Sequence, residues 1–164
     1  MTLRNLRLKM SPKYEKLFDE EIKEFIRISE TFAKEHLGDS VEKLRQNYNE
    51  MEKHFRQVRP PNVQVEDKKV AFKERSLIYR QYSKGTDNKS DLIYFHGGGF
   101  VVGGLESHDD ICAEICESTG CNVFSLDYSL APEVKYPEFF LDAIRFYYFI
   151  KNPERRLILV GDSA

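Results

Sequence analysis

Residues 92–100 read LIYFHGGGF, an apolar strand of four residues that runs directly into a histidine, three glycines and a phenylalanine. A short apolar run bounded by turn residues is typical of a strand that is buried on both faces of a sheet. Glycine leaves its N–H unshielded and takes backbone conformations that are barred to other residues. The segment therefore predicts a buried strand whose carboxyl end carries a loop able to point backbone amides at a developing negative charge.

A flexible or phosphate-binding glycine turn is the alternative explanation for this loop. Residues 100–104, FVVGG, are too apolar for a flexible linker. No Lys-Ser or Lys-Thr pair follows the glycines, as it would in a phosphate-binding P-loop. The composition around the glycines therefore favours a structured loop with a role at a site.

A second apolar strand, Leu157–Val160, leads into Gly161-Asp162-Ser163-Ala164. Strand, glycine, variable residue and serine form the beginning of the G-x-S-x-G pattern. In that pattern a tight turn between a strand and a helix exposes the serine hydroxyl at the top of a sheet. The place of this turn behind an apolar strand makes Ser163 a candidate nucleophile.

The chain between and around these loops predicts an α/β fold. Hydrophobic periodicity predicts helices at about 107–118 and 136–151, and strands at 63–72, 77–82, 92–95, 122–127 and 157–160. The order is strand, strand, strand, helix, strand, helix, strand, with short apolar strands late in the series. Such an order predicts a sheet that becomes parallel and is covered by helices on both faces.

The N-terminal third predicts two amphipathic helices before any strand. Apolar residues recur at helical spacing over residues 12–37, with Ser11 as the expected N-cap, and again over residues 39–58. Asp39 and Glu42 resemble a capping box for the second helix. This pattern predicts a helical cap or lid, although a coiled-coil hairpin or a partner-binding module would have the same one. We expect the helical segment to span residues 1–61 and the α/β core to span residues 62–164.

Composition and charge exclude several classes of partner. The chain has 25 Lys and Arg against 27 Asp and Glu, a net charge of -2, so no basic excess indicates a nucleic-acid partner. The longest apolar-rich stretch, residues 139–150, contains Asp142 and Arg145 and is too short to span a bilayer. We find no apolar run typical of a secretory signal near the N-terminus.

Three cysteines, Cys112, Cys116 and Cys121, lack the C-x2-C spacing of common zinc sites. Their odd number favours a reducing compartment over a disulfide framework. Cys112 and Cys116 share one face of an expected helix, so a shared metal is geometrically possible, but buried and inert thiols are favoured. We therefore expect a cytoplasmic protein that needs no metal or cofactor.

Three segments resemble the hormone-sensitive-lipase family of α/β-hydrolases, which includes bacterial acetyl esterases and arylesterases. They are YFHGGGFVVGGLESHD (94–109), LDYSLAPEVKYP (126–137) and GDSA (161–164). The family carries an HGGG loop, a D-Y-R-L-A-P-E block and a G-D-S-A-G elbow in this order. The resemblance implies the N-terminal part of an α/β-hydrolase fold, incomplete at the elbow. The fold would have a mostly parallel sheet covered by helices and a two-helix cap.

The resemblance also implies roles for individual residues. Ser163 would be the nucleophile that attacks an ester carbonyl. The backbone N–H groups of Gly97, Gly98 and Ala164 would form the oxyanion hole, in which one donor is worth roughly 10²–10³ in rate. The residues expected to support this loop are His96 and Gly99, and those expected to line a substrate pocket are Phe100 and Val101.

The resemblance assigns no chemistry to three further residues, Ser129, His108 and Asp109. Ser129 stands where the family has an arginine, so the contact made by that arginine is in doubt here. His108 and Asp109 match a His/Asp pair of the family to which no chemistry is assigned, and Asp109 is most simply a first-turn helix residue.

The implied function is a serine carboxylesterase or lipase-type hydrolase of small hydrophobic acyl esters, acting through an acyl-enzyme on Ser163. This fold supplies the triad acid and histidine after the nucleophile, which places both beyond Ala164. We therefore expect the chain alone to be inactive, and a second chain could supply the C-terminal half. Two alternatives remain: a receptor-like relative that binds a small molecule without catalysis, and a non-functional remnant of a truncated gene.

Overall fold

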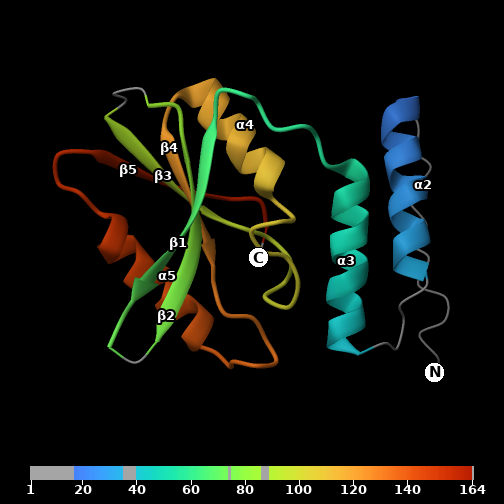
Figure 1. Cartoon of the computed structure of the whole chain (residues 1–164). Helices are drawn as coiled ribbons and strands as arrows, with labels where there is room; N and C mark the ends of the chain where they lie inside the picture. Colours follow the sequence, from blue (N-terminus) through green and yellow to red (C-terminus); the bar gives the residue numbers. More distant parts are fainter. Residues whose placement is uncertain (1–16, 35–39, 74, 86–88, 164) are drawn as a thin grey trace. The chain divides into compact units, whose positions relative to one another are not determined.

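A computed structural model of the chain describes residues 17–34, 40–73, 75–85 and 89–163 (Figure 1). The chain divides into two compact units, Met1–Gly38 and Asp39–Ala164. The first contains helix α2 (Glu20–Lys34), and the second contains the sheet and the other helices. In the part of the chain that is described, no helix combines the length and apolar character needed to cross a membrane.

Both N-terminal helices begin at side-chain caps. Helix α2 begins at Glu20 because Asp19 Oδ1 accepts a hydrogen bond from the Ile22 N–H at 2.8 Å. The expected helix over residues 12–37 is therefore wrong at residues 17–19, which are not helical, and its expected cap Ser11 lies outside the described residues.

Helix α3 (Val41–Phe55) is capped by Ser40, whose hydroxyl accepts a hydrogen bond from the Lys43 N–H at 3.4 Å. The expected cap at Asp39 lies outside the described residues. Glu42 contributes an acidic side chain to the first turn, where it complements the helix dipole. Ser40 makes the capping contact that the sequence pattern suggested for its neighbour.

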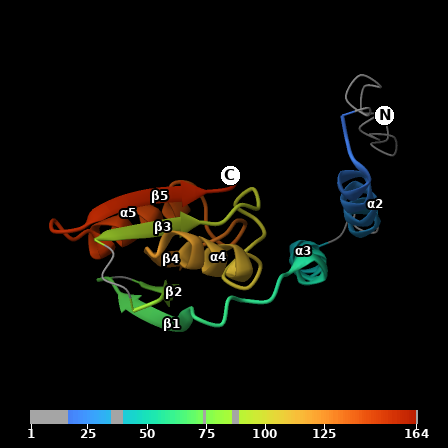
Figure 2. The same ribbon diagram turned by 90° about the horizontal axis from the view of Figure 1, so that it is seen from above.

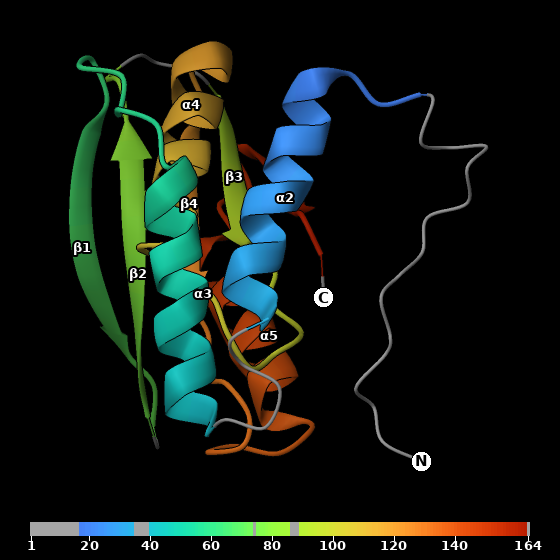
Figure 3. The same cartoon turned by 90° about the vertical axis from the view of Figure 1, so that its right-hand side faces the viewer.

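Five strands form one mixed sheet in the second unit, in the order β1-β2-β4-β3-β5. Pairs β1–β2 and β2–β4 are antiparallel, whereas β4–β3 and β3–β5 are parallel, which confirms a sheet that becomes parallel late in the chain. Figure 2 shows β1 at one edge and β5 at the other, and Figure 3 shows β1 and β2 side by side. The strands are β1 (Gln64–Ala71), β2 (Ser76–Ser83), β3 (Ser90–Phe95), β4 (Asn122–Asp127) and β5 (Arg156–Gly161).

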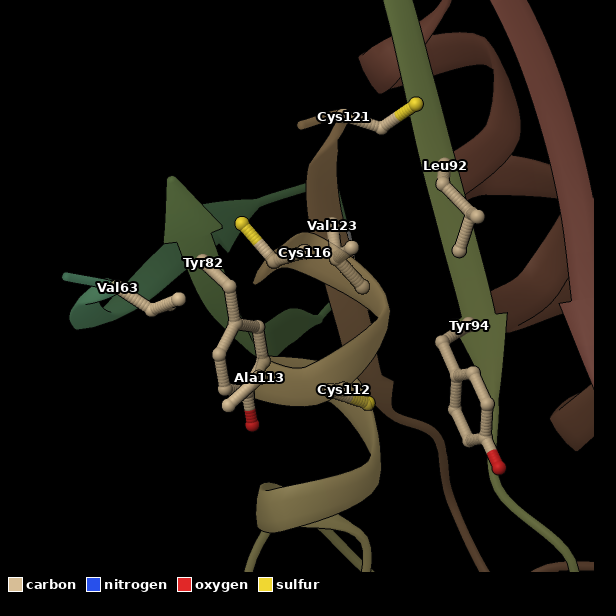
Figure 4. Close-up of a cluster of buried hydrophobic side chains, with 9 residues drawn as sticks. All are labelled: Val63, Tyr82, Leu92, Tyr94, Cys112, Ala113, Cys116, Cys121 and Val123. Atoms are coloured by element: carbon tan, nitrogen blue, oxygen red, sulfur yellow. The ribbon is translucent and has the colours of Figure 1, made fainter. Parts of the chain in front are cut away.

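Helices α4 (Asp109–Thr119) and α5 (Glu138–Ile150) cover opposite faces of this sheet. Successive residues of β3 alternate between the two faces, as the pleat requires. Tyr94 packs with Cys112 of α4 in one buried cluster (Figure 4), and Ile93 packs with Phe146 of α5 in the other. The two cores hold β3 at the centre of the second unit.

The three cysteines are free and lie in the cluster under α4 (Figure 4). Burial raises the pKa of Cys112 to about 12 and the pKa of Cys116 to about 11. Both thiols are therefore uncharged at neutral pH and pack as small hydrophobic side chains. This placement agrees with the expectation of buried, inert thiols.

Strand β5 has no strand on its outer side within the described sheet, and it carries Leu159, which is 55% exposed. An apolar edge strand is a template for pairing with another chain. We predict that the chain self-associates and that Leu159→Lys lowers its mean mass in solution, measured by size-exclusion chromatography with light scattering. The matched control is Val58→Lys, at a residue that is 95% exposed before β1. A monomeric, well-dispersed wild-type chain would contradict the prediction.

Candidate active site

The two loops singled out in the sequence lie side by side. Strands β3 and β5 are parallel neighbours, and Phe95 pairs with Gly161. The carboxyl ends of both strands therefore lie at the same end of the sheet (Figure 2). A Cβ placed on Gly97 would lie 2.9 Å from the Cβ of Ser163 and would clash with Asp162. Glycine at position 97 therefore permits a backbone approach that any side chain would block.

Asp162 fastens the glycine loop to the turn that carries Ser163. Its Oδ1 accepts hydrogen bonds from the Gly97 N–H at 2.8 Å and from the Tyr94 hydroxyl at 2.9 Å, and its Oδ2 lies 3.4 Å from His108 Nε2. Burial acts to raise the pKa of Asp162, but these neighbours outweigh it and hold the pKa below its usual value. Asp162 is thus a carboxylate at neutral pH.

Asp162 is a functional residue that the sequence pattern missed, because its position is variable in G-x-S-x-G. Its presence in the G-D-S-A-G elbow was the available signal. The contact also affects an expected role, since the Gly97 N–H is engaged by Asp162 and does not face an empty oxyanion hole. The expected third donor, Ala164, lies outside the described residues.

The carbonyl groups of the glycine loop are held by donors around it, which leaves two amides open. No acceptor among the described residues binds the N–H of Gly98 or Gly99. The bound carbonyls and their partners are His96 O with Tyr128 OH (2.6 Å), Gly97 O with His96 Nδ1 (2.9 Å), Gly98 O with the N–H of Val101 (3.1 Å) and Val102 (3.0 Å), Phe100 O with the Ala131 N–H (2.8 Å) and Val101 O with Arg45 Nε (2.7 Å).

Gly98 and Gly99 offer a matched pair of substitutions. Gly98 has φ +128°, and a Cβ there would lie 2.7 Å from the carbonyl carbon of Val102, whereas Gly99 has φ +59° and nothing within 4 Å. We predict that Gly98→Ala lowers the free energy of unfolding by about 3 kcal/mol or more, because steric overlap adds to backbone strain. Gly99→Ala should cost about 1–2 kcal/mol, the left-handed penalty alone. Urea denaturation measures both, and equal costs would contradict the loop geometry.

His96 is enclosed within the loop that it begins. Its side chain is 1% exposed and stacks on Tyr128, with ring centroids 4.2 Å apart. Burial lowers the pKa of His96 to about 4, so the ring is neutral at pH 7 and Nδ1 donates to the Gly97 carbonyl. Nε2 is buried and has no hydrogen-bond partner in the described chain. These contacts suit a supporting role, because one ring nitrogen is engaged by Gly97 O and the other is buried.

The buried His96 also predicts a pH dependence of stability. Because its folded pKa of about 4 lies below the ordinary value of 6.5, the unfolded chain binds more protons between these values. Protonation of His96 on unfolding should therefore lower the free energy of unfolding by on the order of 3 kcal/mol as pH falls from 6.5 to 4. Glu52 and Asp127, whose pKa values burial raises, act in the opposite direction.

We predict that His96→Asn flattens the fall in stability over this range, compared with wild type and with the exposed control His54→Asn. Urea denaturation at several pH values between 4 and 7 gives the three slopes. The assignment fails if wild type and His96→Asn lose stability in parallel.

A cavity of about 590 Å³ adjoins Ser163 and is walled mainly by aromatic rings. Phe100, expected to line a pocket, does so and stacks on Phe139 with centroids 4.6 Å apart. Val101 is not among the lining residues. The aromatic residues that sequence reasoning did not assign to this pocket are Phe95, Tyr128, Tyr136, Phe139 and Phe140.

In the loop after β4, Ser129 stands where the related family has an arginine, and an arginine from another segment contacts it. Arg75 brings its guanidinium to this point from the turn before β2, and its Nη2 donates to Ser129 Oγ at 3.1 Å. The same guanidinium binds the fully buried Asp142 at 2.7 Å, and Asp142 in turn accepts the Ser129 N–H at 3.2 Å. A guanidinium is therefore present beside position 129, although it belongs to a different residue.

Arg45 of α3 joins two loops at the site. Its Nε donates to Val101 O at 2.7 Å, and its Nη2 donates to Ala131 O at 2.9 Å. Glu133 binds the same guanidinium through both carboxylate oxygens at 2.7 Å, which fixes its orientation. Helix periodicity alone could not identify this contact, because it depends on which face of α3 meets the loops.

Known proteins with similar sequences and structures are esterases and lipases. A family model for the alpha/beta hydrolase fold matches residues 92–164. An acetyl esterase from Salmonella typhi is 36% identical over 101 residues, which cover 62% of this chain and 31% of that protein. Lipase 2 from Moraxella sp. (strain TA144) is 32% identical over 117 residues, covering 62% of this chain and 27% of that protein.

Comparison with solved structures also finds esterases. The crystal structure of an esterase from the bacterial hormone-sensitive lipase family matches with a TM-score of 0.71 at 25% identity, over 90% of this chain and 48% of that one. This chain thus spans about a third of the curated relatives and about half of this structure. Residues 92–164, which contain the glycine loop and the Ser163 turn, thus match the alpha/beta hydrolase fold, and the chain is similar to esterases of the hormone-sensitive lipase family.

Proposed function

We propose that the protein formed with this chain hydrolyses carboxylic esters through an acyl-enzyme on Ser163. The observation that supports the proposal is a glycine loop that adjoins the Ser163 turn at Gly97 and has two amides without an acceptor among the described residues. The loop carbonyls are bound by donors from within and around the loop, while the N–H groups of Gly98 and Gly99 have no acceptor in the described chain. Donors fixed in this way stabilise the negative charge that an ester carbonyl develops only in the transition state. Relatives named acetyl esterase and lipase support this reaction class.

In this proposal the oxyanion hole consists of the N–H groups of Gly98 and Gly99, with Ala164 as a third donor. Gly97 is no longer proposed as a donor to the oxyanion, because its N–H is engaged by Asp162, and it serves to let the two backbones approach closely. Each remaining donor would be worth roughly 10²–10³ in rate. His96 supports the loop and takes no part in proton transfer.

We further propose that the substrate is a small hydrophobic ester. The cavity beside Ser163 is lined by Phe100 and Phe139 among other rings, and the hydroxyl of Tyr128 in its wall is already used by His96 O. Few polar groups therefore remain to bind a charged or hydroxylated substrate. Burial of each methylene there would contribute about 0.8 kcal/mol of binding free energy.

A serine nucleophile needs a base and a group that orients it. Both nitrogens of His96 are enclosed, and those of His108 face Ser107 and Asp162. We propose that the acid and histidine come from polypeptide beyond Ala164, in a longer protein or in a second chain. We also propose a cytoplasmic location, which the three free thiols support.

We predict that the chain alone shows negligible turnover of p-nitrophenyl acetate. Residues 1–163 joined to the C-terminal part of the Salmonella acetyl esterase should hydrolyse it, because the chain order Ser, acid, His of this fold puts the base in that part. Ser163→Ala in this chimera should lower kcat by about 10⁴-fold or more, since the nucleophile is lost. Ser118→Ala, at an exposed hydroxyl on α4, is the matched control.

Three outcomes would count against this assignment. Activity that survives Ser163→Ala would exclude Ser163 as the nucleophile. Robust turnover by the chain alone would show that it needs no further base. A folded chimera that binds phenyl acetate in the cavity without hydrolysing it would favour the receptor-like alternative.

A further inference from the structure

We propose that His108 is a positioning residue that ties both ends of the glycine loop to Asp162 and so fixes the direction of the open amides. The use of those amides in catalysis rests on the proposed function. The positioning itself rests on contacts of the chain and can be tested without substrate.

At the first end of the loop, His108 and Gly97 bind the same carboxylate. The Gly97 N–H donates to Asp162 Oδ1 at 2.8 Å, and His108 Nε2 lies 3.4 Å from Oδ2. His108 is buried, and its ring lies 5.9 Å from that of Tyr94, whose hydroxyl also binds Asp162. The imidazole therefore limits rotation of the carboxylate that holds Gly97.

At the second end, His108 acts through its neighbour Ser107. His108 Nδ1 lies 2.8 Å from Ser107 Oγ, which accepts the Gly104 N–H at 3.0 Å and lies 3.0 Å from Gly104 O. The residues from Gly97 to Gly104 are thus closed into a ring through Asp162, His108 and Ser107. The two ends also meet directly, since a Cβ on Gly103 would clash with the Gly97 carbonyl and lie 2.6 Å from His96 Nδ1.

The next residue, Asp109, holds this part of the chain in place. Its buried carboxylate accepts hydrogen bonds from Arg80 Nη1 at 2.9 Å and from the Tyr82 hydroxyl at 3.1 Å, both on β2. Because Asp109 is bound to β2, the backbone of His108 is held in a position from which its imidazole reaches the glycine loop. In the His/Asp pair at the start of α4, Asp109 thus binds β2 and His108 contacts the site.

Hydrogen exchange followed by mass spectrometry of peptic peptides tests the proposal on the full chain. We expect His108→Ala to speed exchange in residues 97–104 by about tenfold or more relative to residues 122–127 of β4, because a contact with a charged group is lost. Ser107→Ala removes only a hydroxyl and should speed exchange of the same loop by a smaller factor. The exposed His54→Ala is the control.

The double variant separates positioning from general support. If His108 acts through Asp162, then His108→Ala combined with Asp162→Ala should exchange no faster in residues 97–104 than Asp162→Ala alone. Equal acceleration of the loop and β4, or additive effects in the double variant, would overturn the proposal. If His108→Ala does not fold, an unchanged loop in Ser107→Ala would overturn it as well. An inactive chimera with the expected exchange pattern would contradict the proposed function alone.

Discussion

The hydrogen bond from the Gly97 N–H to the Asp162 carboxylate is the constraint on which the site depends. It joins the loop after β3 to the turn after β5, and it requires a glycine because the two backbones approach closely. Other contacts bind the loop carbonyls, through donors on Tyr128, His96, Val101, Val102, Ala131 and Arg45. Among the described residues, none accepts a hydrogen bond from the N–H of Gly98 or Gly99, the two residues that follow Gly97.

The sheet makes this constraint possible. Strand β3 lies between β4 and β5, and the crossovers through α4 and α5 bury it from both faces, so its carboxyl end is held by the core as well as by the loop contacts. Buried ion pairs then hold the segments that surround the central strands. Asp142 is bound by Arg75 beneath the loop after β4, and Asp109 is bound by Arg80 at the start of α4. Removing Arg75 or Arg80 would weaken the pairing of a buried carboxylate, leaving Arg145 on Asp142 and Arg59 on Asp109 as the remaining cations.

Much of this arrangement could be predicted from the sequence, for identifiable reasons. Apolar runs at residues 92–95 and 157–160 predicted two strands, and parallel neighbours bring their loops to the same end of the sheet. The start of α2 was missed because the cap Asp19 stands inside a pattern that looks continuously helical. Contacts between distant segments were missed as well: Arg75 beside Ser129, Arg45 on Val101, and Asp162 on Gly97. Each of these depends on which side chain reaches across the fold, which periodicity does not encode.

The most direct test of the central constraint is the through-hydrogen-bond scalar coupling between the Gly97 amide nitrogen and the Asp162 carboxyl carbon, measured by NMR on isotope-labelled chain. We predict a resolvable coupling and a Gly97 amide that exchanges far more slowly than that of Gly85, which lies in an exposed turn. No coupling, together with exchange at Gly97 as fast as at Gly85, would contradict the account.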